Sequence, residues 1–280
     1  MTGTLYVVAT PIGNLADMSR RGVQTLSAVQ IIACEDTRRT GTLLSLLDVQ
    51  RPAGQRLVAC HEHNESAVVP QLLEALQQGQ DVALVSDAGT PLLNDPGFNL
   101  LRACAQEDIP VSPIPGAAAP AALLSVCPLP ATPFCFVGFL PARTAKRRAE
   151  LVQLAALPTA LMLFESPHRI ADTLQDLGAV LPERRVFVGR ELTKQYESFY
   201  CGTAAQVLAE LQAREALRGE FVLLIEVPVT VSQGLAARDE KLLRLVAAEV
   251  GPSKAAKLMA QVTDLTRSDL YNVLQESSTR

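Results

Sequence analysis

The most informative stretch of this chain is Leu84-Val-Ser-Asp-Ala-Gly-Thr-Pro91, where an apolar run ends abruptly in a small, polar loop. The run predicts a strand over Asp81–Ser86, and the loop continues through Asn94-Asp-Pro-Gly97. A purely structural loop needs fewer aspartate, glycine, proline and threonine residues than this one holds. We therefore interpret it as a cradle for a polar, zwitterionic ligand, whose amino group Asp87 binds and whose carboxylate is held by backbone N–H groups.

Two other loops share this character. A predicted strand, Leu5–Ala9, runs into Ala9-Thr-Pro-Ile-Gly-Asn-Leu15, and Pro113-Ile-Pro-Gly-Ala-Ala-Ala-Pro-Ala-Ala122 follows a later one. The small side chains of the second loop would let a flat group such as an adenine lie against the backbone, although a tight helix start is the alternative. Ligands of open α/β sheets bind beyond the carboxyl ends of strands, so the loops are candidates for one site. Neither GxGxxG nor GxxxxGK[ST] occurs, which disfavours a dinucleotide or phosphate-loop site.

The pattern of apolar residues predicts an α/β protein of two domains with a small helical appendix. In the first half, strands at Leu5–Ala9, Ile31–Cys34, Arg56–Ala59, Asp81–Ser86 and Val111–Pro113 alternate with helices at Arg20–Val29, Thr40–Leu47, Ser66–Gln78 and Phe98–Glu107. This alternation predicts a mostly parallel sheet. The second half predicts a mixed sheet. Its predicted strands are Phe134–Gly138, Ala160–Phe164, Arg185–Gly189, Ser198–Tyr200 and Phe221–Val227, and its predicted helices are Lys146–Ala156, Arg169–Leu177 and Ala204–Arg214. Helices at Asp239–Val250, Ser253–Val262 and Arg267–Glu276 follow, and we place the domains at 1–116, 117–231 and 232–280.

Composition narrows the class of protein. The 280 residues carry a formal net charge of −4, so any contact with nucleic acid must come from a local basic face. Six scattered cysteines without a CxxC pair indicate small buried side chains in a reducing compartment and not a disulfide framework or zinc site. The sequence shows no signal peptide and no apolar run of membrane-spanning length, and we expect a cytoplasmic protein.

Charged clusters follow several predicted strands. Glu35-Asp-Thr-Arg38 is either part of a site or a helix start with favourable acids, and His61-Glu-His-Asn64 suits a site-lining base better than a metal. Phe164-Glu-Ser-Pro-His-Arg169 and Gly189-Arg-Glu-Leu-Thr-Lys194 would face Glu35, Asp36 and Arg38 across a cleft, unless they form surface salt bridges. Arg143-Thr-Ala-Lys-Arg-Arg148 is the densest basic run, which is either a solvated helix face or a contact with a phosphate backbone.

Seven motifs, in this order and spacing, resemble the tetrapyrrole methylase superfamily and, within it, the ribosomal RNA small-subunit methyltransferase I family. They are Ala9-Thr-Pro-Ile-Gly-Asn14, Glu35-Asp-Thr-Arg38, His61-Glu-His-Asn64, Ser86-Asp-Ala-Gly-Thr-Pro91 with Asn94-Asp-Pro-Gly97, Gly138-Phe-Leu-Pro141, Phe164-Glu-Ser166 with His168-Arg169, and Arg190-Glu-Leu-Thr-Lys194. The resemblance covers nearly the whole chain, and the final helices match the family only loosely.

The resemblance implies a tetrapyrrole methylase-like fold of two α/β domains, with S-adenosylmethionine bound in the cleft between them, and a homodimer. It implies methyl transfer to the ribose 2′-hydroxyl of a cytidine in the decoding region of 16S ribosomal RNA in the small subunit, without a metal. The expected cofactor-binding residues are Pro11, Gly13, Asn14, Ser86, Asp87, Ala88, Gly89, Thr90, Pro91, Pro115, Gly116 and Ala117. Ala117 to Ala119 stand where relatives often carry Pro-Cys or a hydroxyl residue. This difference affects only the expected contacts with the adenine of the cofactor.

A ribose hydroxyl is a poor nucleophile until its proton is removed, so the reaction benefits from a positioned base. The candidates for base or orienting group are Glu35, Glu191 and His61. Arg38, Arg190 and Lys194 are candidates for steering phosphates or stabilising the developing alkoxide. The expected RNA-binding residues, besides the C-terminal helices, are Arg143, Lys146, Arg147, Arg148, His168 and Arg169.

Two alternatives remain open at this stage. The same fold could methylate a tetrapyrrole, such as a precorrin or uroporphyrinogen, or act as a diphthine-type protein methyltransferase, although the forms of the motifs speak against both. A non-enzymatic RNA-binding assembly factor that uses the cofactor only structurally is the other alternative, which the crowded charges at the expected cleft disfavour.

Overall fold

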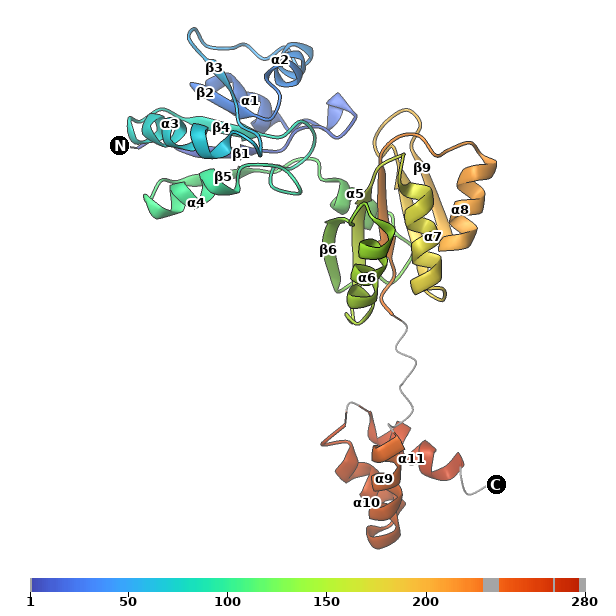
Figure 1. The fold of residues 1–280 in the computed structure, drawn as a ribbon. Coiled ribbons are helices and arrows are strands. Elements are labelled where there is room, and N and C mark those ends of the chain that lie inside the picture. Colours follow the sequence, from blue (N-terminus) through green and yellow to red (C-terminus); the bar gives the residue numbers. More distant parts are fainter. Residues whose placement is uncertain (1, 229–236, 264, 277–280) are drawn as a thin grey trace. The chain divides into compact units, whose positions relative to one another are not determined.

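The computed structural model describes residues 2–228, 237–263 and 265–276, which belong to two compact units, residues 1–228 and 229–280 (Figure 1). The first unit holds two five-stranded sheets, and the second holds helices. The predicted division at residue 116 stays a prediction, and the predicted boundary at residue 231 lies outside the described residues. No helix of the described residues is long and apolar enough to span a membrane.

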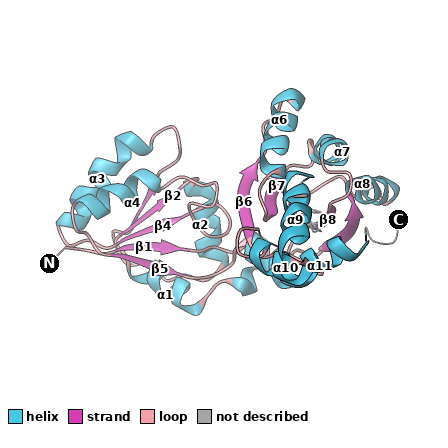
Figure 2. Cartoon of the chain, turned by 90° about the horizontal axis from the view of Figure 1, so that it is seen from below, coloured by secondary structure: helices cyan, strands magenta, loops and turns pink. Residues whose placement is uncertain are grey.

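The first sheet is wholly parallel. The alternation of strands and helices had predicted a mostly parallel sheet. Its strands are β1 (Leu5–Val8), β2 (Ile31–Cys34), β3 (Arg56–Ala59), β4 (Val82–Val85) and β5 (Val111–Ile114), in the order β3-β2-β4-β1-β5 (Figure 2). Strands β2 and β4 are buried throughout, because helices cover both faces of the sheet. All five strands run in one direction, so the loops that follow them leave from one edge.

Alternate residues of these strands pack against two pairs of helices. Ile31, Leu84 and their neighbours form one core with α3 (Glu65–Gln77) and α4 (Phe98–Gln106). Ile32, Val85 and their neighbours form the other core with α1 (Arg20–Ala28) and α2 (Thr37–Leu46). Burial on both faces fixes the register of the strands, and with it the position of each loop at the edge.

The second sheet is mixed, as the second half of the sequence predicted. Its strands are β6 (Phe134–Phe139), β7 (Ala160–Glu165), β8 (Arg185–Arg190), β9 (Ser198–Thr203) and β10 (Phe221–Ile225), in the order β6-β7-β10-β8-β9. Only β6 and β7 are parallel neighbours. One face packs against α6 (Thr144–Ala155), α7 (Ile170–Val180) and α8 (Ala204–Ala213), and the other packs against α5 (Ala119–Ser125) (Figure 1). Helix α5 begins within the alanine-rich loop 113–122. The alternative interpretation of this loop, a tight helix start, is therefore correct from Ala119 onward.

The second unit contains α9 (Ala237–Val250), α10 (Pro252–Met259) and α11 (Arg267–Glu276). Leu243, Met259 and Leu270, one from each helix, are buried together with Ala255 and Ala256. Because each helix turns one apolar face toward this small core, the apolar residues of this segment recur with helical periodicity in the sequence.

Candidate functional site

The three glycine- and proline-rich loops meet at the carboxyl edge of the first sheet. The Thr10 amide donates to the Gly89 carbonyl at 2.9 Å, and the Gly89 amide donates back at 3.1 Å. The Thr90 hydroxyl donates to the Ala117 carbonyl at 3.0 Å. The loops after β1, β4 and β5 are therefore joined by hydrogen bonds into one surface, which confirms the convergence expected from the sequence.

Two glycines make this close approach of the loops possible. A Cβ atom on Gly89 would lie 3.2 Å from Cγ2 of Ile12, and its φ of +87° is one that other residues rarely adopt. A Cβ atom on Gly116 would lie 3.0 Å from Cβ of Ala9. A side chain at position 89 would press on Ile12, and one at position 116 would press on Ala9.

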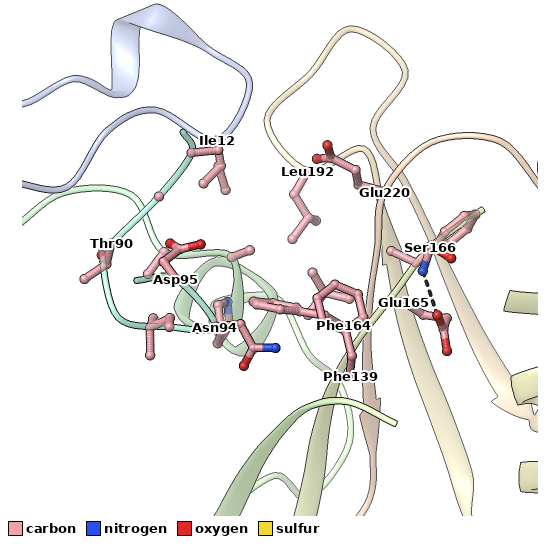
Figure 3. A pocket seen from close by; sticks show the side chains of 18 of the residues that line it. Ile12, Thr90, Asn94, Asp95, Phe139, Phe164, Glu165, Ser166, Leu192 and Glu220 are labelled. Carbon is pink, nitrogen blue, oxygen red and sulfur yellow. Dashed lines mark hydrogen bonds between the residues drawn. The ribbon is translucent and has the colours of Figure 1, made fainter. Parts of the chain in front are cut away.

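A cavity of about 350 Å³ lies between these loops and the second sheet (Figure 3). This volume is within the range of small-molecule sites. One wall is formed by the loops and the start of α5, with Ile12, Ala88, Gly89, Thr90, Leu93, Asn94, Asp95, Ala118, Ala119 and Pro120. The other wall is formed by the second sheet and its loops, with Phe139, Phe164, Glu165, Ser166, Pro167, Leu192, Glu220, Phe221 and Val222.

Side chains that reach across connect the two walls. The amide group of Asn94 lies on Gly138 of β6, where a Cβ atom would be 2.4 Å from its Oδ1. The side chain of Lys194 lies on Gly13 in the same way, with its Cγ 2.3 Å from where a Cβ atom would be. Glycine at positions 13 and 138 therefore lets the walls approach closely enough to enclose the cavity.

Three of the predicted cofactor-binding residues, Ala88, Gly89 and Thr90, line the cavity. The others lie in the same three loops without lining it. These are Pro11, Gly13, Asn14, Ser86, Asp87, Pro91, Pro115, Gly116 and Ala117. Of these, Asn14 accepts a hydrogen bond from the Ala16 amide at the start of the short helix Leu15–Asp17, and Asp87 borders a second, open pocket. The three predicted loops thus border the cavity, and the assignment of their residues to a cofactor stays a prediction.

Of the second wall, Glu165–Pro167 and Leu192 lie in the two clusters that the sequence analysis expected to face the cleft, whereas Glu220, Phe221 and Val222 were not predicted as site residues, and neither was Asp95 of the loops. Phe221 and Val222 belong to strand β10, and nothing in the sequence separates them from ordinary core residues. Asp95 did carry a signal, because it stands inside the quoted Asn94-Asp-Pro-Gly97 motif. Phe139 and Phe164 were also within quoted motifs, and their ring centroids lie 5.7 Å apart at the cavity.

The acidic and basic residues after β2 form the border of the open pocket. Asp36 accepts hydrogen bonds from the Arg38 and Arg39 amides, and its carboxylate pairs with the Arg38 guanidinium at 3.0 Å. The hydrogen bonds from Arg38 lower the pKa of Asp36 to about 2. Arg39 pairs with Asp87 at 2.9 Å. The helix-start explanation therefore holds for Asp36, while the Arg38 side chain stays 90% exposed and available to an anion.

Glu35 and His61 lie just beyond the neighbouring strands β2 and β3, but neither lines the cavity. Burial, and then the charge of Asp87, raises the pKa of the Glu35 carboxyl. Nδ1 of His61 is buried and has no hydrogen-bond partner. The neighbouring Asn64 holds the loop by accepting from the His61 amide at 2.8 Å, so this motif has a structural role as well.

The Arg190–Lys194 cluster forms a network of internal contacts. Oε1 of Glu191 accepts from the Lys194 ammonium at 3.0 Å and from the Glu220 amide at 2.8 Å. Burial alone would raise the pKa of Glu191, but these two hydrogen bonds and the nearby cations lower it instead. Arg190 donates to the carbonyls of Arg218 and Tyr196. A carboxylate stabilised in its charged form is a weak base, so this geometry does not favour Glu191 as the proton acceptor.

The structure corrects one predicted RNA contact. Arg147 is buried, with only 2% of its side chain exposed, and its Nε lies 2.6 Å from a carboxylate oxygen of Asp176. It cannot reach a phosphate backbone from this position, because the helical pattern turns it toward α7. Arg148 pairs with the other Asp176 oxygen but stays half-exposed.

The remaining predicted RNA contacts differ in accessibility. Arg143, Lys146 and His168 are exposed, and their contact with RNA stays a prediction. Arg169 donates to the Leu140 carbonyl and pairs with Glu165 at 3.4 Å, which leaves it partly buried. Within the described residues, no three His, Cys, Asp or Glu side chains are grouped so that they could hold a metal ion.

Comparison with known proteins places this geometry in context. The profile of the Tetrapyrrole (Corrin/Porphyrin) Methylases matches residues 4–208, and the profile of the RsmI C-terminal HTH domain matches residues 233–278. The chain is 44% identical, over 98% of its length and 95% of the relative, to the ribosomal RNA small subunit methyltransferase I of Escherichia coli O157:H7.

Solved structures share the fold at low sequence identity. A diphthine synthase matches with a TM-score of 0.60 at 13% identity, covering 80% of this chain and 89% of that one. Uroporphyrin-III C-methyltransferase from Thermus thermophilus, complexed with S-adenosyl homocysteine, matches with a TM-score of 0.54 at 17% identity, covering 80% of this chain and 98% of that one. At these identities the likeness concerns the fold alone.

Proposed function

This chain belongs to the ribosomal RNA small subunit methyltransferase I family, and from that premise we propose that it methylates small-subunit ribosomal RNA with S-adenosylmethionine. The proposed acceptor is the ribose 2′-hydroxyl of a cytidine in the decoding region of 16S ribosomal RNA. The observation that carries the proposal is the cavity between two walls, one of which is made of three hydrogen-bonded loops at a sheet edge. A cytoplasmic location and a homodimer are parts of the proposal that rest on the family resemblance.

The lining of the cavity fits such a cofactor. The backbone of Ala88 to Thr90 is accessible because Gly89 carries no side chain, and Ala118 and Ala119 leave room for a flat ring. Apolar side chains such as Ile12 and Leu192 exclude water from the rest. When bound, S-adenosylmethionine supplies a methyl group already activated on a sulfonium. The chain itself must then hold the acceptor hydroxyl in line and accept its proton.

The border of the open pocket suits an anionic acceptor. Arg38 and Arg39 project guanidinium groups that are 90% and 72% exposed. Guanidinium groups bind phosphate oxygens with two parallel hydrogen bonds, which favours an RNA backbone over an uncharged acceptor. Arg38 pairs with Asp36 and Arg39 pairs with Asp87. Asp87 belongs to the loop that also supplies part of the cavity wall.

A labelling assay tests the proposed function. The protein is incubated with methyl-labelled S-adenosylmethionine and either small ribosomal subunits or a uroporphyrinogen. We expect label on the RNA and none on the porphyrinogen. Label on the porphyrinogen would assign the chain to tetrapyrrole methylation, and binding of S-adenosylmethionine without label on either acceptor would indicate a non-enzymatic role.

Charge reversal on α6 tests the proposed RNA contact. The double variant Arg143→Glu with Lys146→Glu is expected to weaken binding to small-subunit RNA, because two exposed cations are replaced by anions. Each lost phosphate contact should reduce the slope of log affinity against log salt by about 0.7 to 0.9. Filter binding at several salt concentrations measures both quantities.

A matched control separates a local contact from overall charge. Arg51→Glu with Arg56→Glu makes the same change in net charge, but near the amino end of β3, at the opposite edge of the sheet from the loops. This control should bind RNA nearly as wild type does. Equal losses in both double variants would show that only net charge matters and would remove α6 from the docking surface.

A further inference from the structure

Phe139 is a half-exposed aromatic side chain in the wall that the second sheet contributes to the cavity. It is the last residue of β6 and is 49% exposed, whereas Phe136 and Phe164 beside it are partly buried. A single exposed apolar side chain is common on a protein surface and by itself points to no ligand. Phe139 differs from such a residue because an irregularity of its strand directs it to the cavity.

A β-bulge in β6 decides which way Phe139 points. The register with β7 shifts between Phe136 and Gly138, so Val137 is the extra residue of the bulge. Side chains alternate between the two faces of a strand, and an unbroken β6 would direct Phe139, with Val137, toward the core under α6, α7 and α8. The extra residue puts Phe139 on the face of Phe136 instead, which is the face of α5 and the cavity. Bulges often re-aim a side chain beside a site in this way.

The rings of Phe136, Phe164 and Phe139 form one connected aromatic surface. The Phe139 and Phe164 centroids lie 5.7 Å apart with the rings inclined at 59°, and the Phe164 and Phe136 centroids lie 5.1 Å apart with the rings inclined at 72°. These tilted arrangements are favourable for aromatic pairs. Figure 3 shows Phe139 and Phe164 across the cavity from Thr90. Such a surface suits a flat, unsaturated ring.

Phe139 is also close to the exposed cations at the start of α6. Residues 140–143 connect β6 to α6, and both Arg143 and Lys146 are exposed. Four residues of extended chain reach about 14 Å at most, which limits the distance between the Cα atoms of Phe139 and Arg143. One strand of RNA can therefore contact the cations through its phosphates and Phe139 through a base.

We propose that Phe139 is the platform on which the base of the acceptor nucleotide stacks while its ribose enters the cavity. This inference rests on the proposed function and adds a residue that positions the acceptor. Proteins commonly bind single-stranded RNA by stacking its unpaired bases on aromatic side chains. Ala118 and Ala119, on the opposite wall, leave room for the adenine of the cofactor, so Phe139 remains for the acceptor. Stacking would hold the 2′-hydroxyl in line with the methyl group.

The test compares wild type with Phe139→Leu and Phe139→Tyr in the methylation of small ribosomal subunits at saturating S-adenosylmethionine. Leucine is apolar but has no ring face, whereas tyrosine keeps the face. We expect Phe139→Leu to lower kcat/KM for the subunits by roughly 5- to 150-fold, which corresponds to the stacking energy of one base, about 1–3 kcal/mol. Phe139→Tyr should retain most of the wild-type value.

Phe134→Leu is the matched control. Phe134 begins the same strand and is 43% exposed, but it does not line the cavity. The same substitution there removes an exposed ring away from the acceptor, so kcat/KM should equal that of wild type. Calorimetry should show that Phe139→Leu binds S-adenosylmethionine as tightly as wild type does. A weaker affinity for the cofactor, with unchanged kcat/KM at saturation, would make Phe139 a cofactor contact and overturn the proposal.

An abasic acceptor tests the stacking itself. Small subunits are reconstituted with 16S ribosomal RNA that keeps the ribose of the methylated nucleotide but lacks its base. Removal of the base should lower kcat/KM for wild type and should affect Phe139→Leu far less, because the variant has already lost the stack. Equal losses in the two proteins would show that the base and Phe139 act independently, and the proposal would be wrong. This comparison holds even if the substitution weakens the enzyme in general.

The outcomes separate this inference from the proposed function. If wild type methylates the RNA and Phe139→Leu keeps the wild-type kcat/KM, the role of Phe139 is wrong while the proposed function stands. Equal losses in Phe139→Leu and Phe134→Leu would show an effect on the whole strand and would also remove that role. If wild type methylates no RNA, the proposed function and the role of Phe139 are both wrong.

Discussion

Gly89→Val is expected to weaken binding of S-adenosylmethionine by roughly 5- to 150-fold. Valine at a φ of +87° is strained by about 1–3 kcal/mol, and about 1.4 kcal/mol corresponds to a tenfold change in affinity. Relief of this strain moves the loop away from Thr10, to which Gly89 is joined by two backbone hydrogen bonds. The new side chain would also press on Ile12, which lines the same wall. Isothermal titration calorimetry measures the affinity directly.

Gly54→Val is the matched control for this prediction. Gly54 has a nearly equal φ of +82°, but no atom lies within 4 Å of where its Cβ would be, and it belongs to the turn before β3. The control therefore carries the backbone strain without disturbing the cavity, and its affinity for S-adenosylmethionine should equal that of wild type. Unchanged affinity in Gly89→Val would show that the loop after β4 does not form the cofactor site.

Asp176→Ala is expected to destabilise the first unit by about 3–5 kcal/mol, because removing one partner leaves a buried charge uncompensated. Its two carboxylate oxygens each lie 2.6 Å from a guanidinium nitrogen, one of Arg147 and one of Arg148. The Arg147 side chain is 2% exposed and cannot turn to solvent without disrupting α6. Urea denaturation followed by circular dichroism measures the loss.

The control for this prediction is Asp172→Ala, one turn earlier on α7. Asp172 is exposed, so its replacement should change the free energy of unfolding by less than about 0.5 kcal/mol. A loss below about 1 kcal/mol in Asp176→Ala would mean that water compensates Arg147. In that case the predicted contact of Arg147 with RNA would have to be considered again.

Regular elements could be predicted from the sequence because their signals are local. Strands β2 and β3 and helix α11 have the predicted bounds, since short apolar runs and helical periodicity are local features of the sequence. Most other elements differ by one to three residues at their ends, as with α2, which begins at Thr37 because Asp36 caps it. The parallel character of the first sheet and the mixed character of the second also followed from the local patterns of apolar residues.

The parts of the site that could not be predicted depend on contacts between distant residues. Arg147 stands in a basic run like its neighbours, and only its pairing with Asp176, 29 positions away, distinguishes it. Asn94 and Gly138 are likewise brought together only by the fold.

Nucleoside mass spectrometry of treated RNA tests the central claim most directly. Small subunits from a strain that lacks this modification are incubated with the purified protein and methyl-labelled S-adenosylmethionine, and their 16S ribosomal RNA is digested to nucleosides. We predict that the label appears in 2′-O-methylcytidine, in a fragment from the decoding region. Label in a base-methylated nucleoside, or in no nucleoside, would contradict the proposal that the cavity serves transfer to a ribose hydroxyl.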